Sequence, residues 1–350
     1  MLSPMRASMG RLAEHWYAAA RAEELPRGRP LGRTLLGELL VLFRDERGDA
    51  HALADRCLHR NALLSEGVVV GGCVACPYHG WTYDADGRCV NVPSESRDGS
   101  PRTELTLEAF PVREEHELIW VYMGPSKRPR GNPFPMPVKR GDGWGSYWMT
   151  TRFDNDVPNL VENFMDVPHT VFVHRGWFRT RSRKKVGMSV ERTESSVLVT
   201  YDQPNDSIGF TRLLANPRRL PMVHTDKYYL PATTRVDYAF GDEARAFIIT
   251  STCRPISPSE TEVFTLISFK LGRVTPYIRP LLNWYTKKVI HQDVEIMEIQ
   301  GRSLRHHGAP LFASTPADTL HVHIEALLEW AASEEGPPPP RVVDRVEFWI

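Results

Sequence analysis

The chain has 350 residues, 41% of them hydrophobic and 25% charged, and its 43 Lys and Arg are balanced by 43 Asp and Glu. This composition is typical of a globular protein of about two domains, and the lack of a basic excess argues against a nucleic-acid binder. No apolar stretch reaches the ~20 residues of a membrane-spanning helix, and residues 1–25 lack the apolar core of a secretion signal. We therefore expect a soluble, cytoplasmic protein without a membrane or nucleic-acid partner.

The first third of the chain consists of short apolar segments bounded by Gly, Asp and Pro. Residues 34–43, 50–54 and 118–123 carry Leu, Val, Ile and aromatic side chains, which predict strands. We expect an all-β domain over residues 12–125. Residues 126–145 contain four prolines and four glycines, which predict a connection between domains.

The remainder of the chain mixes helical and strand patterns, so we expect an α+β domain over residues 146–350. Apolar residues recur at helical intervals in two segments, 158–174 and 277–303. Strands of an antiparallel sheet are predicted at residues 196–203, 244–253 and 261–271. A short C-terminal strand is predicted at residues 342–350, after a run of four prolines.

Four of the five cysteines lie within 33 residues, and two histidines lie among them. Cys57-x-His59 and Cys76-x-x-His79 each offer one thiolate and one imidazole, a set that suits tetrahedral zinc or a two-iron cluster. Zinc fingers usually place their two Cys before their two His, whereas the two types alternate here. A Rieske centre binds one iron by two Cys and the other by two His. The order favours the Rieske centre over zinc or four unrelated buried residues.

The segments around these residues, ending in Cys76-Pro77-Tyr78-His79-Gly80-Trp81, resemble the Rieske proteins, and among them the Rieske non-haem iron oxygenases. Respiratory Rieske proteins carry a further disulfide-bonded cysteine in each loop, but Ala62 and Tyr78 stand at those positions here. The resemblance implies one [2Fe–2S] cluster per chain with four ligands: Cys57, His59, Cys76 and His79. Cys73 and Cys89 match no ligand of this motif.

A second group of candidate ligands lies in the segment from Glu162 to His174. His169 and His174 are five residues apart, about 140° of rotation on an ideal helix, so the helix must end or loosen between them, near Pro168. Two histidines and one carboxylate form the facial triad of non-haem Fe(II) oxygenases. A histidine pair alone is more often structural, and the carboxylate must come from elsewhere in the chain.

The pattern Asp166-x-x-His169-x4-His174, preceded by Asn163, again resembles the Rieske oxygenases. The resemblance implies one Fe(II) per chain bound by His169 and His174, with Asn163 at the catalytic site. The third ligand of the family is an aspartate on a late helix. Asp293 is the expected residue, in competition with two nearby glutamates, Glu295 and Glu298.

The resemblance also implies a homotrimer in which the cluster of one chain serves the iron of the next. In that arrangement Asp166 forms an inter-subunit electron-transfer bridge between its own His169 and His79 of the partner subunit. The implied electron donor is a ferredoxin, a reductase carrying flavin and an iron–sulfur cluster, or both.

At 350 residues the chain looks more like the vanillate and dicamba O-demethylase type than the longer ring-dihydroxylating members. We therefore expect a terminal oxygenase that hydroxylates or oxidatively demethylates a small aromatic or alicyclic substrate. A cis-dihydroxylating dioxygenase is one alternative; an electron-transfer Rieske protein without oxygenase activity and a zinc-dependent nucleic-acid binder are two others. The expected pocket aromatics are Phe172, Phe210, Tyr228, Tyr229, Tyr238 and Phe247, and the arginines that could steer a carboxylate are Arg212, Arg218 and Arg219.

Overall fold

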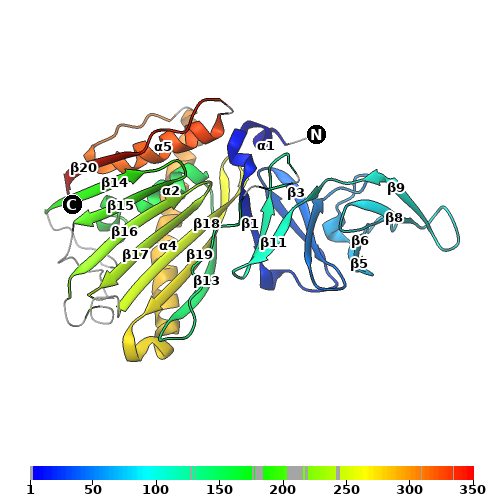
Figure 1. The fold of residues 1–350 in the computed structure, drawn as a ribbon, viewed down its shortest axis with the longest axis horizontal. Helices are drawn as coiled ribbons and strands as arrows, with labels where there is room; N and C mark the ends of the chain where they lie inside the picture. The colour runs from blue at the N-terminus through cyan, green and yellow to red at the C-terminus, as the bar shows by residue number, and fades with distance from the viewer. Residues whose placement is uncertain are drawn as a thin grey trace. The chain divides into compact units, whose positions relative to one another are not determined.

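The structure is a computed structural model, and it describes residues 3–126, 128–129, 131–175, 177, 184–202, 216, 220–241, 245–308, 310–333 and 335–350. The chain forms two compact units (Figure 1). Unit 1 comprises Met1–Pro135 and Arg254–Ser257, and unit 2 comprises Met136–Cys253 and Pro258–Ile350. The domain limits expected from the sequence stay a prediction.

Unit 1 is built of short antiparallel strands. In its described part they form three sheets, with strand orders β1-β12-β11, β10-β4-β3-β2 and β5-β6-β7-β8-β9. The strands are β1 (Trp16–Arg21), β2 (Leu31–Leu35), β3 (Glu38–Arg44), β4 (Ala50–Ala54), β5 (Val68–Val70), β6 (Cys73–Ala75), β7 (Thr82–Tyr83), β8 (Arg88–Val92), β9 (Ser100–Thr106), β10 (Ala109–Phe110), β11 (Val112–Glu115) and β12 (Leu118–Tyr122). The short helices are α1 (Pro4–Ser8), η1 (Gly10–Glu14), η2 (Ala22–Glu24) and η3 (Leu64–Glu66).

Residues 34–43, predicted as one strand, belong to two strands joined by a tight turn. Leu35 pairs with Glu38, and the two residues between them have positive φ, 52° at Leu36 and 73° at Gly37. Two-residue hairpin turns of this kind match the twist of the strands that they connect. Leucine seldom adopts positive φ, so Gly37 alone could have indicated the turn.

The core of unit 1 lies beneath the predicted cluster loops. It contains Val41 and Phe43 of β3, Val74 of β6 and Tyr83 of β7, and the buried side chains of Cys57 and Cys76 belong to the same cluster. Packing around both cysteines therefore holds the starts of the two loops in place. Cys89 is also fully buried in this core, as expected for a cysteine that serves as a small apolar residue.

Unit 2 is an eight-stranded antiparallel sheet with helices packed against it. The strand order is β13-β19-β18-β17-β16-β15-β14-β20. The strands are β13 (Gly145–Phe153), β14 (Lys185–Arg192), β15 (Ser196–Asp202), β16 (Met222–Tyr229), β17 (Thr233–Phe240), β18 (Arg245–Ser257), β19 (Glu260–Lys270) and β20 (Val342–Trp349). The helices are α2 (Val157–Met165), η4 (Pro168–Val171), η6 (Gly272–Val274), α4 (Thr275–His307), η7 (Pro316–Asp318) and α5 (Thr319–Ala332).

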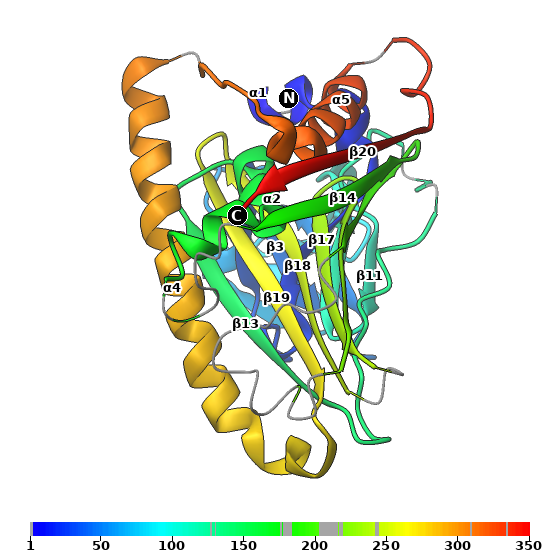
Figure 2. The same ribbon diagram turned by 90° about the vertical axis from the view of Figure 1, so that its left-hand side faces the viewer.

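The long helix α4 runs beside the sheet, and α2 contacts both α4 and α5 (Figure 2). Leu282 of α4 packs into a cluster with inward-facing residues of the sheet, among them Tyr147, Tyr238 and Phe269. The late predicted helix and the predicted strands at residues 261–271 and 342–350 correspond to α4, β19 and β20. The first residue of the segment predicted at 244–253 and the last of that at 196–203 lie outside the described residues.

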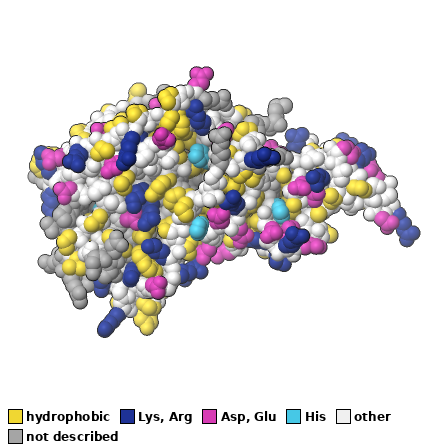
Figure 3. All heavy atoms as spheres, viewed as in Figure 1, with side chains coloured by type: hydrophobic (Ala, Val, Ile, Leu, Met, Phe, Trp, Pro, Cys, Tyr) yellow, Lys and Arg dark blue, Asp and Glu magenta, His cyan; other side chains and the backbone are white. Residues whose placement is uncertain are grey.

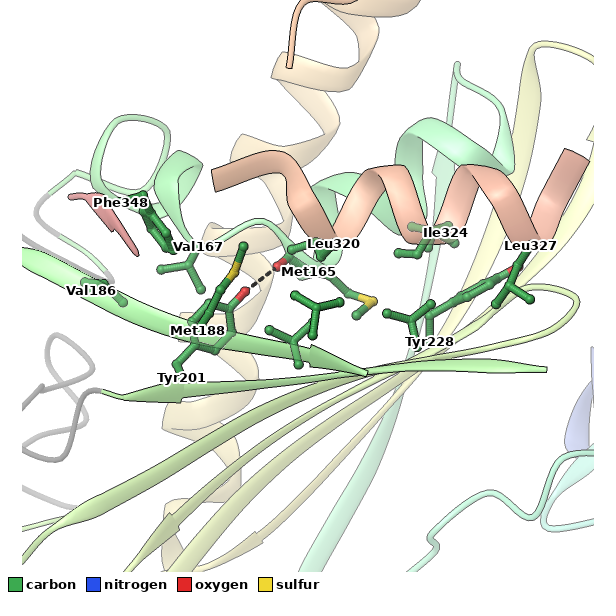
Figure 4. Packing of buried hydrophobic residues seen from close by; sticks show 14 residues of the cluster. Met165, Val167, Val186, Met188, Tyr201, Tyr228, Leu320, Ile324, Leu327 and Phe348 are labelled. Carbon is green, nitrogen blue, oxygen red and sulfur yellow. Dashed lines mark hydrogen bonds between the residues drawn. The ribbon is translucent and has the colours of Figure 1, made fainter. Parts of the chain in front are cut away.

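A second apolar cluster positions the end of α2. Leu320, Ile324 and Leu327 of α5 point toward the sheet (Figure 4) and are almost fully buried. The hydroxyl of Tyr201 on β15 donates a hydrogen bond of 3.2 Å to the carbonyl of Met165, the last residue of α2. The segment that follows α2 therefore starts from a fixed point above the sheet.

The surface seen in Figure 3 carries basic and acidic side chains interspersed with one another. Basic and acidic residues are also equally frequent in the sequence, with 43 of each. Within the described ranges, the helices are all too short or too polar to span a bilayer.

Candidate metal centres

The first predicted ligand pair lies on the loop between β4 and η3. The amide of Cys57 donates to the carbonyl of Ala62 at 2.9 Å, and the amide of Asn61 donates to the carbonyl of Cys57 at 2.9 Å. Asn61 closes this loop with φ of 61°, a conformation that Asn tolerates better than most residues. The result is a tight turn that carries Cys57 and His59 two residues apart.

The second pair lies on a loop of the same design between β6 and β7. The amide of Cys76 donates to the carbonyl of Trp81 at 2.8 Å, and the amide of Gly80 donates to the carbonyl of Cys76 at 3.1 Å. Gly80 has φ of 73° at the position that corresponds to Asn61. Each loop therefore presents one cysteine and one histidine from the same backbone turn, as the sequence pattern predicts.

The side chains of the two loops converge with their sulfurs inside and their imidazoles outside. Cys57 and Cys76 are buried, whereas His59 is half-buried and His79 is exposed. The two histidine rings lie 4.5 Å apart between centroids, and the Trp81 ring stacks on His59 at 4.9 Å. Sulfur and nitrogen donors are thus separated into an inner and an outer pair, the arrangement that a Rieske cluster requires.

The polar contacts of these loops fit a metal cluster. Burial raises the pKa of the Cys76 thiol, and burial together with His79 and Arg60 lowers the pKa of the His59 imidazole. A neutral imidazole is the form that binds a metal, whereas the thiols need a cation beside them to ionise. The Nδ1 atom of His59 is buried without a hydrogen-bond partner in the described structure, which is rare for a buried nitrogen unless it binds an ion.

The second candidate site begins where α2 ends. Asp166 caps the helix with an extended backbone, and Pro168 then starts the short helix η4 that carries His169. The α-helix has thus ended before His169, as the five-residue spacing predicts. His174 follows η4, and both imidazoles face the buried Asp293 of α4.

Three candidate ligand atoms meet at this point. The Nε2 atoms of His169 and His174 lie 3.3 Å apart, and Oδ1 of Asp293 lies 3.6 Å and 3.1 Å from them, respectively. With bonds of about 2.1 Å, one cation at equal distance from all three would have ligand angles of about 95° to 120°. Glu295 and Glu298 are exposed on α4 and do not join the group.

Each of the two histidines is held by a hydrogen bond, His174 at its imidazole ring and His169 at its backbone amide. The side-chain oxygen of Gln292 lies 3.0 Å from Nδ1 of His174, so Nδ1 donates and Nε2 is left as the metal-facing nitrogen. Oδ2 of Asp166 accepts a hydrogen bond from the His169 amide at 3.1 Å and lies 3.6 Å from Nδ1 of the same histidine. Sequence reasoning missed Gln292, whose only signal was its place beside Asp293.

The charges around this group favour a cation. Burial alone would lower the pKa of His169, but Asp166 and Asp293 outweigh burial and the pKa is raised. Oδ1 of Asp293 and Oδ1 of Asn163 are buried and lack a hydrogen-bond partner among the described residues. Two carboxylates and an unsatisfied amide oxygen around two imidazoles therefore fit one divalent ion.

A cavity of about 120 Å³ opens onto the three candidate ligands. Its walls come from α2, η4, α4 and the inner face of β13 and β16 to β19, and are mostly apolar. Of the aromatic residues expected there, Tyr238 and Phe247 line it, together with Phe153 and Phe164, which were not expected. Phe172 is exposed instead, and Tyr228 belongs to the core beneath α5. Four other expected pocket residues lie outside the described ranges: Phe210, Arg212, Arg218 and Arg219.

The same cavity contains a buried histidine and aspartate that sequence reasoning did not single out. His224 and Asp226 of β16 are 1% and 2% exposed, and Nε2 of His224 lies 2.8 Å from Oδ1 of Asp226. The only available signal was alternation on β16, where His224 and Asp226 take the inward positions between Met222 and Tyr228.

Two family models cover most of the chain. Residues 15–111 match the Rieske [2Fe–2S] domain, and residues 153–334 match the vanillate O-demethylase oxygenase C-terminal domain. The chain belongs to the Rieske non-haem iron oxygenases. The predicted family is therefore confirmed, and so are the [2Fe–2S] cluster and the mononuclear iron that this family carries.

Curated relatives of this Rieske oxygenase include the oxygenase component of dicamba O-demethylase from Stenotrophomonas maltophilia. It is 34% identical over 63% of this chain and 61% of its own length, so the matched part spans less than two thirds of that relative. The 4beta-methylsterol monooxygenase of Methylococcus capsulatus is 24% identical over 95% of this chain and 93% of its own.

Solved structures confirm the predicted fold class, an all-β Rieske domain followed by an α+β domain. Dicamba monooxygenase bound to dicamba superposes with a TM-score of 0.74 at 24% identity over 92% of this chain and 97% of that one. A mutant of NdmA from Pseudomonas putida CBB5 with theobromine has a TM-score of 0.76 at 22% identity, over 93% of this chain and 92% of its own. At this level of identity the likeness concerns the fold.

Proposed function

We propose that this chain is the terminal component of an oxygenase that monooxygenates a small aromatic or alicyclic substrate, by hydroxylation or oxidative demethylation. The observation that carries the proposal is the convergence of His169, His174 and Asp293 on the wall of an apolar cavity. A protein that only transfers electrons needs neither the three ligands nor the cavity. Two of the relatives carry the names of a demethylase and a monooxygenase.

We assign the ligands of each metal centre from the side chains that meet at the two sites. Cys57 and Cys76 would hold one iron of the cluster, and His59 and His79 the other. His169, His174 and Asp293 would hold the mononuclear Fe(II), which supplies dioxygen activation and leaves coordination positions for dioxygen and substrate. One oxygen atom enters the substrate, and the other leaves as water with two electrons from a redox partner and two protons.

The surrounding residues would orient the ligands and the substrate. Gln292 would orient the His174 imidazole and Asp166 the His169 backbone, and the mostly apolar wall would exclude water from the reacting carbon. Asn163 lines the cavity with its buried amide, a position from which it would contact the substrate or a bound water. Asp166 would also reach His79 of the partner subunit in a homotrimer and carry electrons between the two centres.

The identity of the electron donor and the trimer rest on the family resemblance, whereas the proposed cytoplasmic location rests on the sequence of residues 1–25 and the lack of a long apolar stretch. A ferredoxin or a flavin–iron–sulfur reductase would deliver electrons one at a time to the cluster. Dihydroxylation remains the second candidate, because the oxygenase subunit of a 3-chlorobenzoate-3,4-dioxygenase from Comamonas testosteroni is 34% identical over 48% of this chain.

The proposal is tested by metal content and oxygen uptake. We expect about three irons per chain, two in the cluster and one alone, and substrate-dependent oxygen uptake by the reduced protein. Candidate substrates are methoxylated aromatics, N-methyl compounds and steroids. About two irons per chain, with no uptake with any of these compounds, would assign the chain to electron transfer instead.

Replacement of Gln292 by leucine tests the orientation of His174. Leucine has no oxygen to accept the hydrogen bond from Nδ1 of His174, so the His174 ring becomes free to rotate. Loss of a hydrogen bond that orients a metal-binding histidine typically weakens metal binding about 10- to 100-fold. Fe(II) affinity is measured by competition with a chelator. The matched control is Gln300→Leu on the same helix, whose side chain accepts a hydrogen bond from Asn155; its iron affinity should not change. Equal Fe(II) affinities in the two variants would show that Gln292 does not orient His174.

A further inference from the structure

Strand β20 lies at one edge of the eight-stranded sheet, next to β14 (Figure 2). No other described strand pairs with its outer side. The pairing with β14 runs from Val342 to Trp349 without a bulge, and this stretch contains no proline. Natural edge strands are usually short, bulged or interrupted by proline, because a free edge can pair with another chain. β20 has none of these three features, and it lies outside both ranges that match the family models.

The backbone groups that face this free edge belong to alternate residues. Lys184 and Ile350, just beyond the two strands, exchange both of their backbone hydrogen bonds, at 3.2 Å and 3.0 Å. Such hydrogen-bonded pairs recur at every second residue of an antiparallel ladder, so the even-numbered residues of β20 bond to β14. The odd-numbered residues point their N–H and C=O groups away from β14: Val343, Arg345, Glu347 and Trp349. These groups make no hydrogen bond to another residue that the structure describes.

The side chains of the same four residues lie on the outer face of the strand. Side chains alternate between the two faces of a strand, and the even-numbered Val346 and Phe348 pack into the cluster beneath α5. On the opposite face, Val343 is 51% exposed and Trp349 is 67% exposed. Tryptophan is enriched at the centres of protein interfaces. An exposed tryptophan on an unpaired strand edge therefore indicates a surface that another chain covers.

The two charged residues of this face are available to a further partner. Arg345 forms no ion pair with any residue of the described ranges. Glu347 pairs with Lys185 of β14 at 3.0 Å, but both side chains are more than half exposed, and such surface ion pairs contribute little to stability. Arg345 and Glu347 have opposite charges and stand two positions apart on the same edge. This spacing decides the register in which the strand can pair with a second copy of itself.

Two copies of β20 related by a two-fold axis would pair antiparallel, with odd-numbered residues opposite odd-numbered residues. A register centred on Arg345 or on Glu347 places two like charges directly opposite each other, which destabilises a sheet. The register centred on Val346 instead places Arg345 opposite Glu347 of the partner subunit. In the same register Val343 stands opposite Trp349 of the partner subunit, and residues 343–349 pair along their full length. Opposite charges and aromatic–β-branched pairs both stabilise antiparallel strands.

We propose that β20 is the contact through which two copies of this chain associate, forming one continuous antiparallel sheet across a two-fold axis. A second copy is the partner because the charges of this edge are complementary to themselves in one register. Addition of a strand to a free edge supplies backbone hydrogen bonds, and the paired side chains supply specificity. This inference goes beyond the proposed function and does not depend on it. Together with the proposed homotrimer, whose contacts join the two metal centres, the two-fold contact would produce a hexamer.

The number of chains in the assembly tests the proposal, and sedimentation equilibrium of the metal-loaded 350-residue chain measures it. We expect an even number, two for the contact alone and six if the trimer also forms. Arg345→Glu and Glu347→Arg each bring like charges opposite one another on both sides of the axis. Each should raise the dissociation constant of the two-fold contact at least about tenfold. The double variant Arg345→Glu/Glu347→Arg restores opposite charges and should restore the dissociation constant to within about threefold.

Val343→Pro tests the backbone hydrogen bonds separately from the charges. The N–H group of Val343 points away from β14, so proline removes no hydrogen bond within the chain but removes one to the partner subunit on each side of the axis. We expect the same dissociation as in the charge variants. The matched control is Arg152→Glu on β13, the strand at the opposite edge of the same sheet, where Arg152 is exposed and pairs with Glu260. It reverses the same charge and should leave the number of chains unchanged.

Three results would overturn the proposal. They are one or three chains in the unmodified protein at every concentration measured, an even-numbered assembly that all three single variants of β20 leave intact, and a double variant that dissociates as readily as the single ones. Circular dichroism and iron content establish that each variant is folded. Restored association in the double variant supports the register centred on Val346, because a second charge reversal would not rescue a single variant that had merely misfolded.

Discussion

Replacement of His169 by alanine is expected to remove the mononuclear iron and all substrate-dependent oxygen uptake, while the [2Fe–2S] cluster stays in place. Nε2 of His169 is one of three atoms that meet within 3.6 Å of one another. Without it, two protein ligands remain, too few for the facial triad. The cluster loops belong to unit 1 and His169 to unit 2, so each unit should load its own metal. Iron and acid-labile sulfide analysis, together with the visible spectrum of the cluster, measures both centres.

His291→Ala on α4 is the matched control for this experiment. His291 is exposed and pairs with Glu295 at 3.3 Å, only two residues before Asp293. Its loss should change neither the iron content nor oxygen uptake. If His169→Ala lost the cluster as well, the two centres would not be separable. If it kept a full complement of iron, the ligand assignment would be wrong.

The cluster loops could be predicted from the sequence because their geometry is local. Each pair of candidate ligands lies within four residues, and one short turn brings the pair together. The end of α2 before His169 was also predictable, since the spacing of His169 and His174 does not suit a single helical face. In both cases the information is contained in a few consecutive residues.

Asp293 and the cavity depend on contacts between distant parts of the chain. The packing of α4 beside α2 and the segment that follows it brings Asp293 to the histidines. The family resemblance, not the spacing, indicated which of three acidic residues it would be. Strands β14, β16 and β17 were not predicted, so the register that places His224 beside Tyr201 and Tyr238 could not be foreseen. A histidine on an alternating strand reads as an ordinary core residue until its neighbours across the sheet are known.

Replacement of Asp166 by asparagine is expected to leave both metal centres filled but to slow reoxidation of the reduced cluster by about 100-fold. The side-chain oxygen of asparagine can still accept the hydrogen bond that the His169 amide donates to Oδ2 of Asp166 at 3.1 Å. The turn after α2 should therefore persist. What is lost is the negative charge 3.6 Å from Nδ1 of His169, and removal of a carboxylate beside a metal-binding imidazole typically lowers activity about 10- to 100-fold. Stopped-flow absorbance of the pre-reduced protein, mixed with dioxygen and substrate, measures the rate.

Glu162→Gln provides the comparison, because Glu162 is a carboxylate on α2, one turn before Asp166, that pairs with His321 at 2.7 Å. Both variants remove one negative charge from neighbouring positions, but only Asp166 contacts a candidate iron ligand. Slow reoxidation in Asp166→Asn alone, with unchanged iron content, therefore assigns the effect to the link between the two centres. Loss of iron in Asp166→Asn would instead mean that the carboxylate holds His169 in place within its own chain, and normal single-turnover rates would rule out the bridge altogether.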